Sequence, residues 1–91
     1  MSPAVDKLTY IPVKVLFFGR LKEIAGLAEE SLEVHPGTRI EDLFSRFVRV
    51  MPELARYRSS LVASRNQEFA AWDVELESGD EVAFLPPVSG G

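Results

Sequence analysis

The chain has 91 residues, 46% of them hydrophobic and 26% charged, which is ordinary for one soluble globular domain with a single core and little room for an enclosed pocket. It contains no cysteine, which excludes disulfides, thiolate nucleophiles and thiolate-bound metal centres, so any sulfur chemistry must use sulfur supplied from outside. Its net charge of -4, without a basic cluster, argues against a nucleic-acid-binding surface.

The sequence contains neither a secretory h-region nor an apolar stretch long enough to cross a bilayer. We therefore expect a cytoplasmic protein that does not act at a membrane. The single histidine, His35, lies in a His-Pro-Gly-Thr segment that is typical of a turn. A lone imidazole without partner ligands is expected to be structural, and no metal site is predicted.

The first secondary-structure element follows a loose N-terminal extension, predicted for residues 1–11. Residues 13–18 alternate as a strand whose core face carries Val13, Val15 and Phe17. Leu16 and Phe18 then point to the opposite face. An apolar residue on the open face of a sheet is either covered by a loop or offered to a partner, so both are candidate partner contacts.

A short helix over residues 20–25, closed by Gly26, and a second strand over 30–35 come next. Thr38 and Glu41 have the spacing of a capping box and predict the start of the main helix. Its apolar stripe follows the i, i+3, i+4 pattern of a core-facing helix. The stripe comprises Ile40, Leu43, Phe44, Phe47, Val48 and Met51.

The pattern predicts a brief helical turn over 52–57, which begins at Pro52. Strands are predicted over 61–63 and 69–72, on either side of an Asn66-Gln67 turn, and a last strand over 81–85. Val82 and Phe84 should face the core, while Leu85 should lie outward as a third candidate contact. The order predicts an α+β fold with one main helix across a mixed sheet, a β-grasp domain over residues 12–86.

The last residues are predicted to form a flexible, extended tail over 87–91. Pro86 and Pro87 lack the amide donors of a continuing strand, and Gly90 and Gly91 can pass a narrow channel because they have no Cβ. Five residues can carry the terminus roughly 17 Å from the domain. The alternative is a frayed terminus, but such an end needs no Pro-Pro spacer. The carboxylate of Gly91 is therefore the candidate reactive group.

These features resemble one known family. The segment Val-Lys-Val-Leu-Phe-Phe at 13–18, Asn66-Gln67, and the stretch Gly-Asp-Glu-Val-Ala-Phe-Leu-Pro-Pro-Val-Ser-Gly-Gly at 79–91 closely resemble the small, ubiquitin-like sulfur-carrier subunits of molybdopterin synthase. The resemblance runs from about residue 13 to residue 91 and is most specific in the last thirteen residues. It implies a ubiquitin-like fold.

The resemblance implies that a partner related to ubiquitin-activating enzymes adenylates the carboxylate of Gly91, using ATP and magnesium, and that a thiocarboxylate follows. The thiocarboxylate would donate sulfur to a cyclic pyranopterin precursor held by the large synthase subunit. Gly90 would assist by its conformational freedom, and the tail residues Pro86, Pro87, Val88 and Ser89 would contact the partner. The chain would be the non-catalytic sulfur donor of a heterotetramer, with no tightly bound cofactor.

Three alternatives stay open. A sulfur carrier for thiamine or cysteine synthesis would share the loading reaction but give its sulfur to another acceptor. The segment Phe-Leu-Pro-Pro-Val-Ser at residues 84–89, just before the two glycines, favours molybdopterin synthesis only by resemblance. A ubiquitin-like modifier would instead form isopeptide bonds with protein lysines. A pure interaction domain would use no tail chemistry at all.

Overall fold

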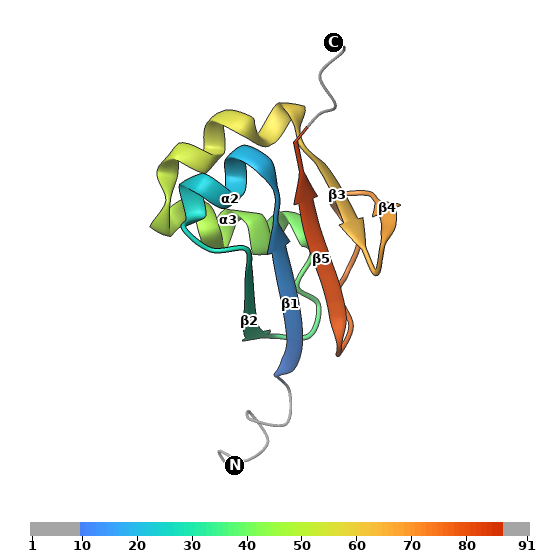
Figure 1. The fold of residues 1–91 in the computed structure, drawn as a ribbon. Helices are drawn as coiled ribbons and strands as arrows, with labels where there is room; N and C mark the ends of the chain where they lie inside the picture. Colours follow the sequence, from blue (N-terminus) through green and yellow to red (C-terminus); the bar gives the residue numbers. More distant parts are fainter. Residues whose placement is uncertain (1–9, 87–91) are drawn as a thin grey trace.

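The computed structural model describes residues 10–86 (Figure 1). Within these residues three helices and five strands follow one another. They are β1 (Ile11–Phe17), α2 (Gly19–Ala25), β2 (Glu29–Val34), α3 (Ile40–Val50), the 3₁₀ helix η1 (Pro52–Ser60), β3 (Val62–Arg65), β4 (Glu68–Ala70) and β5 (Asp80–Leu85). Strand β1 thus begins at the last residue of the predicted extension. None of the helices among the described residues is long and apolar enough to cross a membrane.

The strands form a single sheet in the order β2-β1-β5-β3-β4. The first and last strands lie side by side and parallel, with Val15 opposite Val82, while every other pair is antiparallel. Parallel neighbours need a crossover connection, and the segment from α3 to β4 supplies it. The mixed sheet and the helix across it confirm the predicted β-grasp fold.

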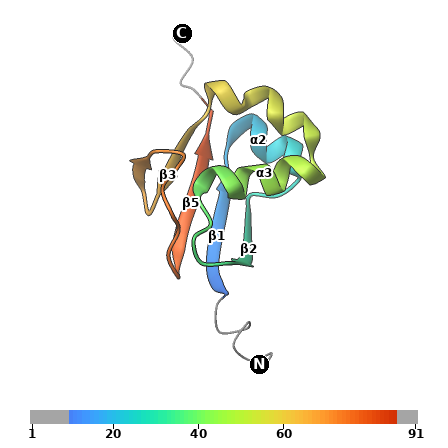
Figure 2. The same ribbon diagram turned by 180° about the vertical axis from the view of Figure 1, so that it is seen from behind.

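The helices lie on one face of the sheet and leave the other face open (Figures 1 and 2). On β1 the alternation is as predicted, because Val13, Val15 and Phe17 are buried and the residues between them are not. The rings of Phe17 and Phe47 meet edge to face at 5.1 Å. The rest of the predicted stripe on α3 also faces the core, with Ile40, Leu43 and Phe44 buried.

The predicted capping box at Thr38 and Glu41 is wrong. Helix α3 begins at Ile40 with Arg39 as its N-cap, and the Arg39 amide donates to the Asp42 carboxylate at 2.9 Å. The next amides are used by the loop after β4. The Ile40 N–H donates to the carbonyl of Val74 (3.0 Å) and the Glu41 N–H to that of Trp72 (2.8 Å). Backbone carbonyls brought by tertiary folding therefore replace the expected side-chain cap.

The Asn66-Gln67 turn is confirmed as a two-residue hairpin between β3 and β4. Both residues have positive φ, 53° and 73°, as hairpin turns of this kind require. Asn66 also ties the hairpin to β5, since its Nδ2 donates to Asp80 at 3.0 Å and its Oδ1 accepts from the Glu81 amide at 2.9 Å. Asp80 further accepts the Glu77 amide at 2.8 Å, so this buried carboxylate is well satisfied.

The two strands of this hairpin begin and end at other residues than predicted. Strand β3 covers residues 62–65 instead of 61–63, and β4 covers 68–70 instead of 69–72. Trp72 therefore lies in a turn, where its ring stacks on Phe84 at 5.6 Å and the Arg58 guanidinium covers it at 3.5 Å from the ring centroid. Aromatic character alone predicts burial at this position but does not distinguish a strand from a turn.

The corrected cap predicts a difference between two variants. Asp42→Ala should lower the free energy of unfolding by about 0.5–1 kcal/mol, because the Arg39 amide loses its acceptor and the helix start loses a favourable negative charge. Thr38→Val, which removes the hydroxyl of the expected cap, should stay within about 0.5 kcal/mol of wild type. Urea denaturation measures both, and the opposite ranking would restore Thr38 as the cap.

Candidate functional site

The base of the tail lies at the end of β5, beside the start of α2 (Figure 1). A Cβ added to Gly19 would lie only 3.2 Å from Pro86 Cγ, and Gly19 has a positive φ of 55°. Pro86 is half-buried, so it packs in space that exists because Gly19 has no side chain. The other tail residues of the predicted site, Pro87, Val88, Ser89, Gly90 and Gly91, lie outside the described residues.

The open face of the sheet carries a row of residues set by strand register. Leu16 on β1 lies opposite Ala83 on β5, which lies opposite Ser64 on β3, which lies opposite Phe69 on β4. Since successive side chains alternate between the two faces, all four share the face away from the helices. The next register position adds Leu85 opposite Val62.

We call this surface the apolar face, comprising Leu16, Phe18, Val62, Phe69, Ala83 and Leu85. It is exposed, because Phe69 is 81% accessible and Phe18 and Val62 are each 44% accessible. A shallow cavity of about 350 Å³ opens between these side chains other than Val62, with Ser64, Gln67 and Glu81 completing its lining. Val62 lines a neighbouring hollow together with Phe69. An exposed apolar patch with a polar rim is typical of a protein-binding surface.

The structure brings together the predicted contacts Leu16, Phe18 and Leu85, which line one cavity next to the tail base. It also adds Phe69 and Val62, which sequence reasoning missed. The sequence predicted Phe69 as the first residue of a strand but did not predict which face of the sheet its side chain lies on. The available signal was the Asn66-Gln67 hairpin, which sets Phe69 opposite Ser64, but the face follows only from the pairing of β3 with β5.

One cation lies near the tail base. Arg20, in the first turn of α2, contacts Glu23 with Nη1 at 3.1 Å from Oε1. The side chain of Tyr57, and to a smaller extent that of Glu23, raises the pKa of the Arg20 guanidinium above its usual value through hydrogen bonding. Arg20 is exposed, so it presents a permanent positive charge to solvent near the start of the tail.

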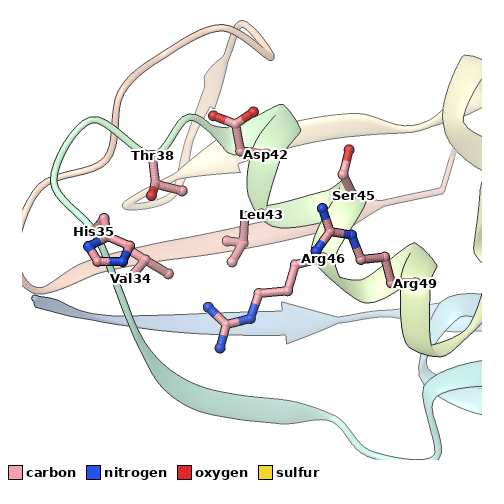
Figure 3. Close-up of a pocket in the computed structure, with 8 residues that line it drawn as sticks. All are labelled: Val34, His35, Thr38, Asp42, Leu43, Ser45, Arg46 and Arg49. Atoms are coloured by element: carbon pink, nitrogen blue, oxygen red, sulfur yellow. The ribbon is translucent and has the colours of Figure 1, made fainter.

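A second cavity, of about 460 Å³, lies between α3 and β2 (Figure 3) and shares no lining residue with the apolar face. Its lining includes Arg46 and Arg49 of α3 and His35 of the loop that follows β2. The ring of His35 packs against that of Tyr10 at 4.5 Å, which is consistent with the structural role predicted for it. Among residues 10–86 no cluster of three histidine or carboxylate side chains is arranged to hold a metal ion.

Comparison with known proteins identifies the family. The ThiS family model matches residues 15–91. The molybdopterin synthase sulfur carrier subunit of Chlamydomonas reinhardtii is 40% identical over 87% of this chain and 98% of its own length. The protein of the same name from Arabidopsis thaliana is 30% identical over 94% of this chain and 90% of its own length.

Among solved structures, SAMP1 from Haloferax volcanii superimposes with a TM-score of 0.76 at 30% identity, covering 88% of this chain and 99% of that one. SAMP1 stands for small archaeal modifier protein 1, and a second structure of it superimposes with a TM-score of 0.76 at 27% identity. The β-grasp fold shared with this neighbour thus places the chain in the class of ubiquitin-like proteins. Within that class, this chain belongs to the ThiS family.

The geometry predicts that the apolar face does not stabilise the fold. Phe69→Ser should leave the free energy of unfolding within about 0.5 kcal/mol of wild type, because its ring is mostly in water. Phe84→Ala, on the same sheet but inside the core, should cost about 3–5 kcal/mol. Thermal or urea unfolding of the two variants measures this contrast, and a large loss at Phe69 would show that its ring is packed in solution.

Proposed function

We propose that this protein is the sulfur carrier subunit of a molybdopterin synthase. The observation that carries the proposal is the family match that continues through Gly91, together with relatives of that name aligned over nearly their whole length. The apolar face beside the tail base supports it, because a carrier must dock on partners that receive its tail. The proposal also places the protein in the cytoplasm.

The proposed chemistry takes place at the Gly91 carboxylate. A carboxylate is a poor electrophile, so the activating partner first joins it to AMP from ATP with magnesium, releasing pyrophosphate. A donor that delivers sulfur at the oxidation level of sulfide then attacks the carbonyl carbon, and the new C–S bond replaces the C–O bond to AMP, which leaves a thiocarboxylate on Gly91. The thiocarboxylate sulfur would then bond to the pyranopterin precursor, and water would cleave its bond to the carbonyl carbon and restore the Gly91 carboxylate. Gly90 and the spacer from Pro86 to Ser89 would let this end enter the partner's active site.

The described residues fit a division of labour in which the partners hold the catalytic groups. The chain has no cysteine with which to carry sulfur itself. Its own contribution is positioning. The apolar face fixes the domain on the partner, and the contact between Pro86 and Gly19 fixes where the tail starts. We further propose that two copies of the chain flank two large subunits in a heterotetramer.

Loading should be visible as a mass change. Co-produced with a competent activating enzyme, the chain should become heavier by the difference between one sulfur and one oxygen atom, localised to Gly91 by fragmentation. Adding one alanine after Gly91 should abolish loading without changing the unfolding transition, because the reactive carboxylate is displaced by one residue. Intact-mass spectrometry tests both, and normal loading of the extended chain would contradict the mechanism.

Docking should depend on the apolar face. Phe69→Ser and Leu16→Ser should each weaken binding to the large synthase subunit at least tenfold, because exposed aromatic and aliphatic side chains at the centre of a patch dominate such interfaces. Val50→Ser is the matched control, since Val50 is 77% exposed on α3, on the other side of the sheet. Isothermal titration calorimetry gives the affinities. An equal loss of affinity in the control would contradict the apolar face as the docking surface.

A protein modifier is the second candidate function, favoured by the 30% identity to SAMP1 over nearly all of that protein. Both functions begin with activation of the Gly91 carboxylate, but a modifier passes it to a lysine amine. Proteolysis of cellular proteins would then leave branched Gly-Gly remnants on lysines. Conversion of the pyranopterin precursor on addition of the large subunit, without such remnants, supports the sulfur carrier.

A further inference from the structure

The groove between α3 and β2 has no part in the function proposed above. Its floor is made by Val34 and Leu43, which are almost completely buried, so a ligand would meet mainly its polar walls. Those walls carry the guanidinium groups of Arg46 and Arg49, the His35 ring and the hydroxyls of Thr38 and Ser45. At about 460 Å³ the groove is within the size range of ligand sites.

The two arginines give this groove a positive charge on an otherwise acidic protein. Among residues 10–86 neither Arg46 nor Arg49 forms an ion pair, and the ion pairs that occur there join Arg20 to Glu23 and Arg65 to Asp80. Arg46 makes only one long hydrogen bond, from Nη1 to the Glu33 carbonyl at 3.3 Å. Most of its donors are therefore available to an anion.

Asp42 is the acidic residue in the lining, and its position limits its effect. Its carboxylate accepts the Arg39 amide at 2.9 Å, and Figure 3 shows it directed away from the Arg46 guanidinium. With His35 counted as neutral, two arginines and one aspartate leave the lining with a net charge of +1. That charge balances one carboxylate better than a phosphate group, which carries about -1.5 to -2.

The helix start offers no alternative phosphate site. Phosphates at helix N-termini are held by free backbone amides, but here those of Arg39, Ile40 and Glu41 already donate to Asp42, Val74 and Trp72. Recognition in this groove must come from side chains. Arginine side chains hold carboxylates with paired hydrogen bonds.

We propose that this groove docks an acidic segment of a partner protein, with a carboxylate held by Arg46 and Arg49. The groove lies on the side of the sheet that the helices cover (Figures 1 and 2), whereas the apolar face lies on the opposite side, so both surfaces can be occupied together. The partner chemistry is argued from charge complementarity and from the open shape of the groove, which admits a chain segment. The docking is independent of the Gly91 reaction.

A randomised peptide library displayed on phage and panned against the full chain tests this proposal. The enriched peptides should share aspartate or glutamate residues. Their affinity, measured by fluorescence anisotropy, should fall at least tenfold in Arg46→Glu and in Arg49→Glu and should also fall with added salt. Arg56→Glu is the matched control, since it changes the net charge equally on an exposed position of η1 and should bind as wild type does.

Several results would overturn the proposal. These are enriched peptides without acidic residues, no enriched peptides at all, an equal loss in Arg56→Glu, or a loss in Phe69→Ser that moves the binding to the apolar face. Displacement of the peptides by an equal concentration of inorganic phosphate would identify a phosphate site instead. Thermal unfolding checks each variant, and Arg46→Gln replaces Arg46→Glu if the reversal unfolds the domain, with a smaller loss expected in the same direction.

Discussion

The parallel pairing of β1 with β5 is the constraint on which the rest of this structure depends. It joins the two ends of the domain at the centre of the sheet and sets Leu16 opposite Ala83 and Phe17 opposite Phe84. One set of these pairs builds the core and the alternate set builds the apolar face, because neighbouring residues on a strand point to opposite sides. A one-residue slip would exchange the two sets.

The same pairing connects the domain with its tail. Strand β5 ends beside the start of α2, so Pro86 meets Gly19 within a few residues of Leu85 and Phe18. The apolar face and the tail base thus lie next to each other. In the proposed function, a partner bound to the apolar face would receive the tail from a nearby point, which would limit the volume that its reactive end must search.

The two cavities show how a small domain can use both sides of its sheet. The apolar face relies on exposed rings and aliphatic side chains that contribute little to folding, whereas the groove beside α3 relies on arginines without carboxylate partners among the described residues. Neither surface requires an enclosed pocket, which a chain of this length has little material to build.

Much of the fold could be predicted from local pattern. The alternation in β1, the stripe of α3 and the Asn66-Gln67 turn each reflect the preferences of a short segment, and all three are as expected. The cap of α3 could not be predicted in this way, because its amides bind carbonyls of a loop more than thirty residues later. Phe69 escaped notice for the same reason, since its face depends on the pairing of β3 with β5.

By itself, the amino-acid sequence determined the β-grasp class, the outward positions of Leu16, Phe18 and Leu85, and the Gly-Gly ending on which the proposed chemistry rests. These follow from periodicity and from residue types, which act over a few neighbouring positions. Only the tertiary structure decided that Phe69 and Val62 complete the apolar face, that Pro86 packs on Gly19, and that Arg46 and Arg49 share a groove with His35. Those arrangements join residues distant in the chain, and strand register and helix packing place them together.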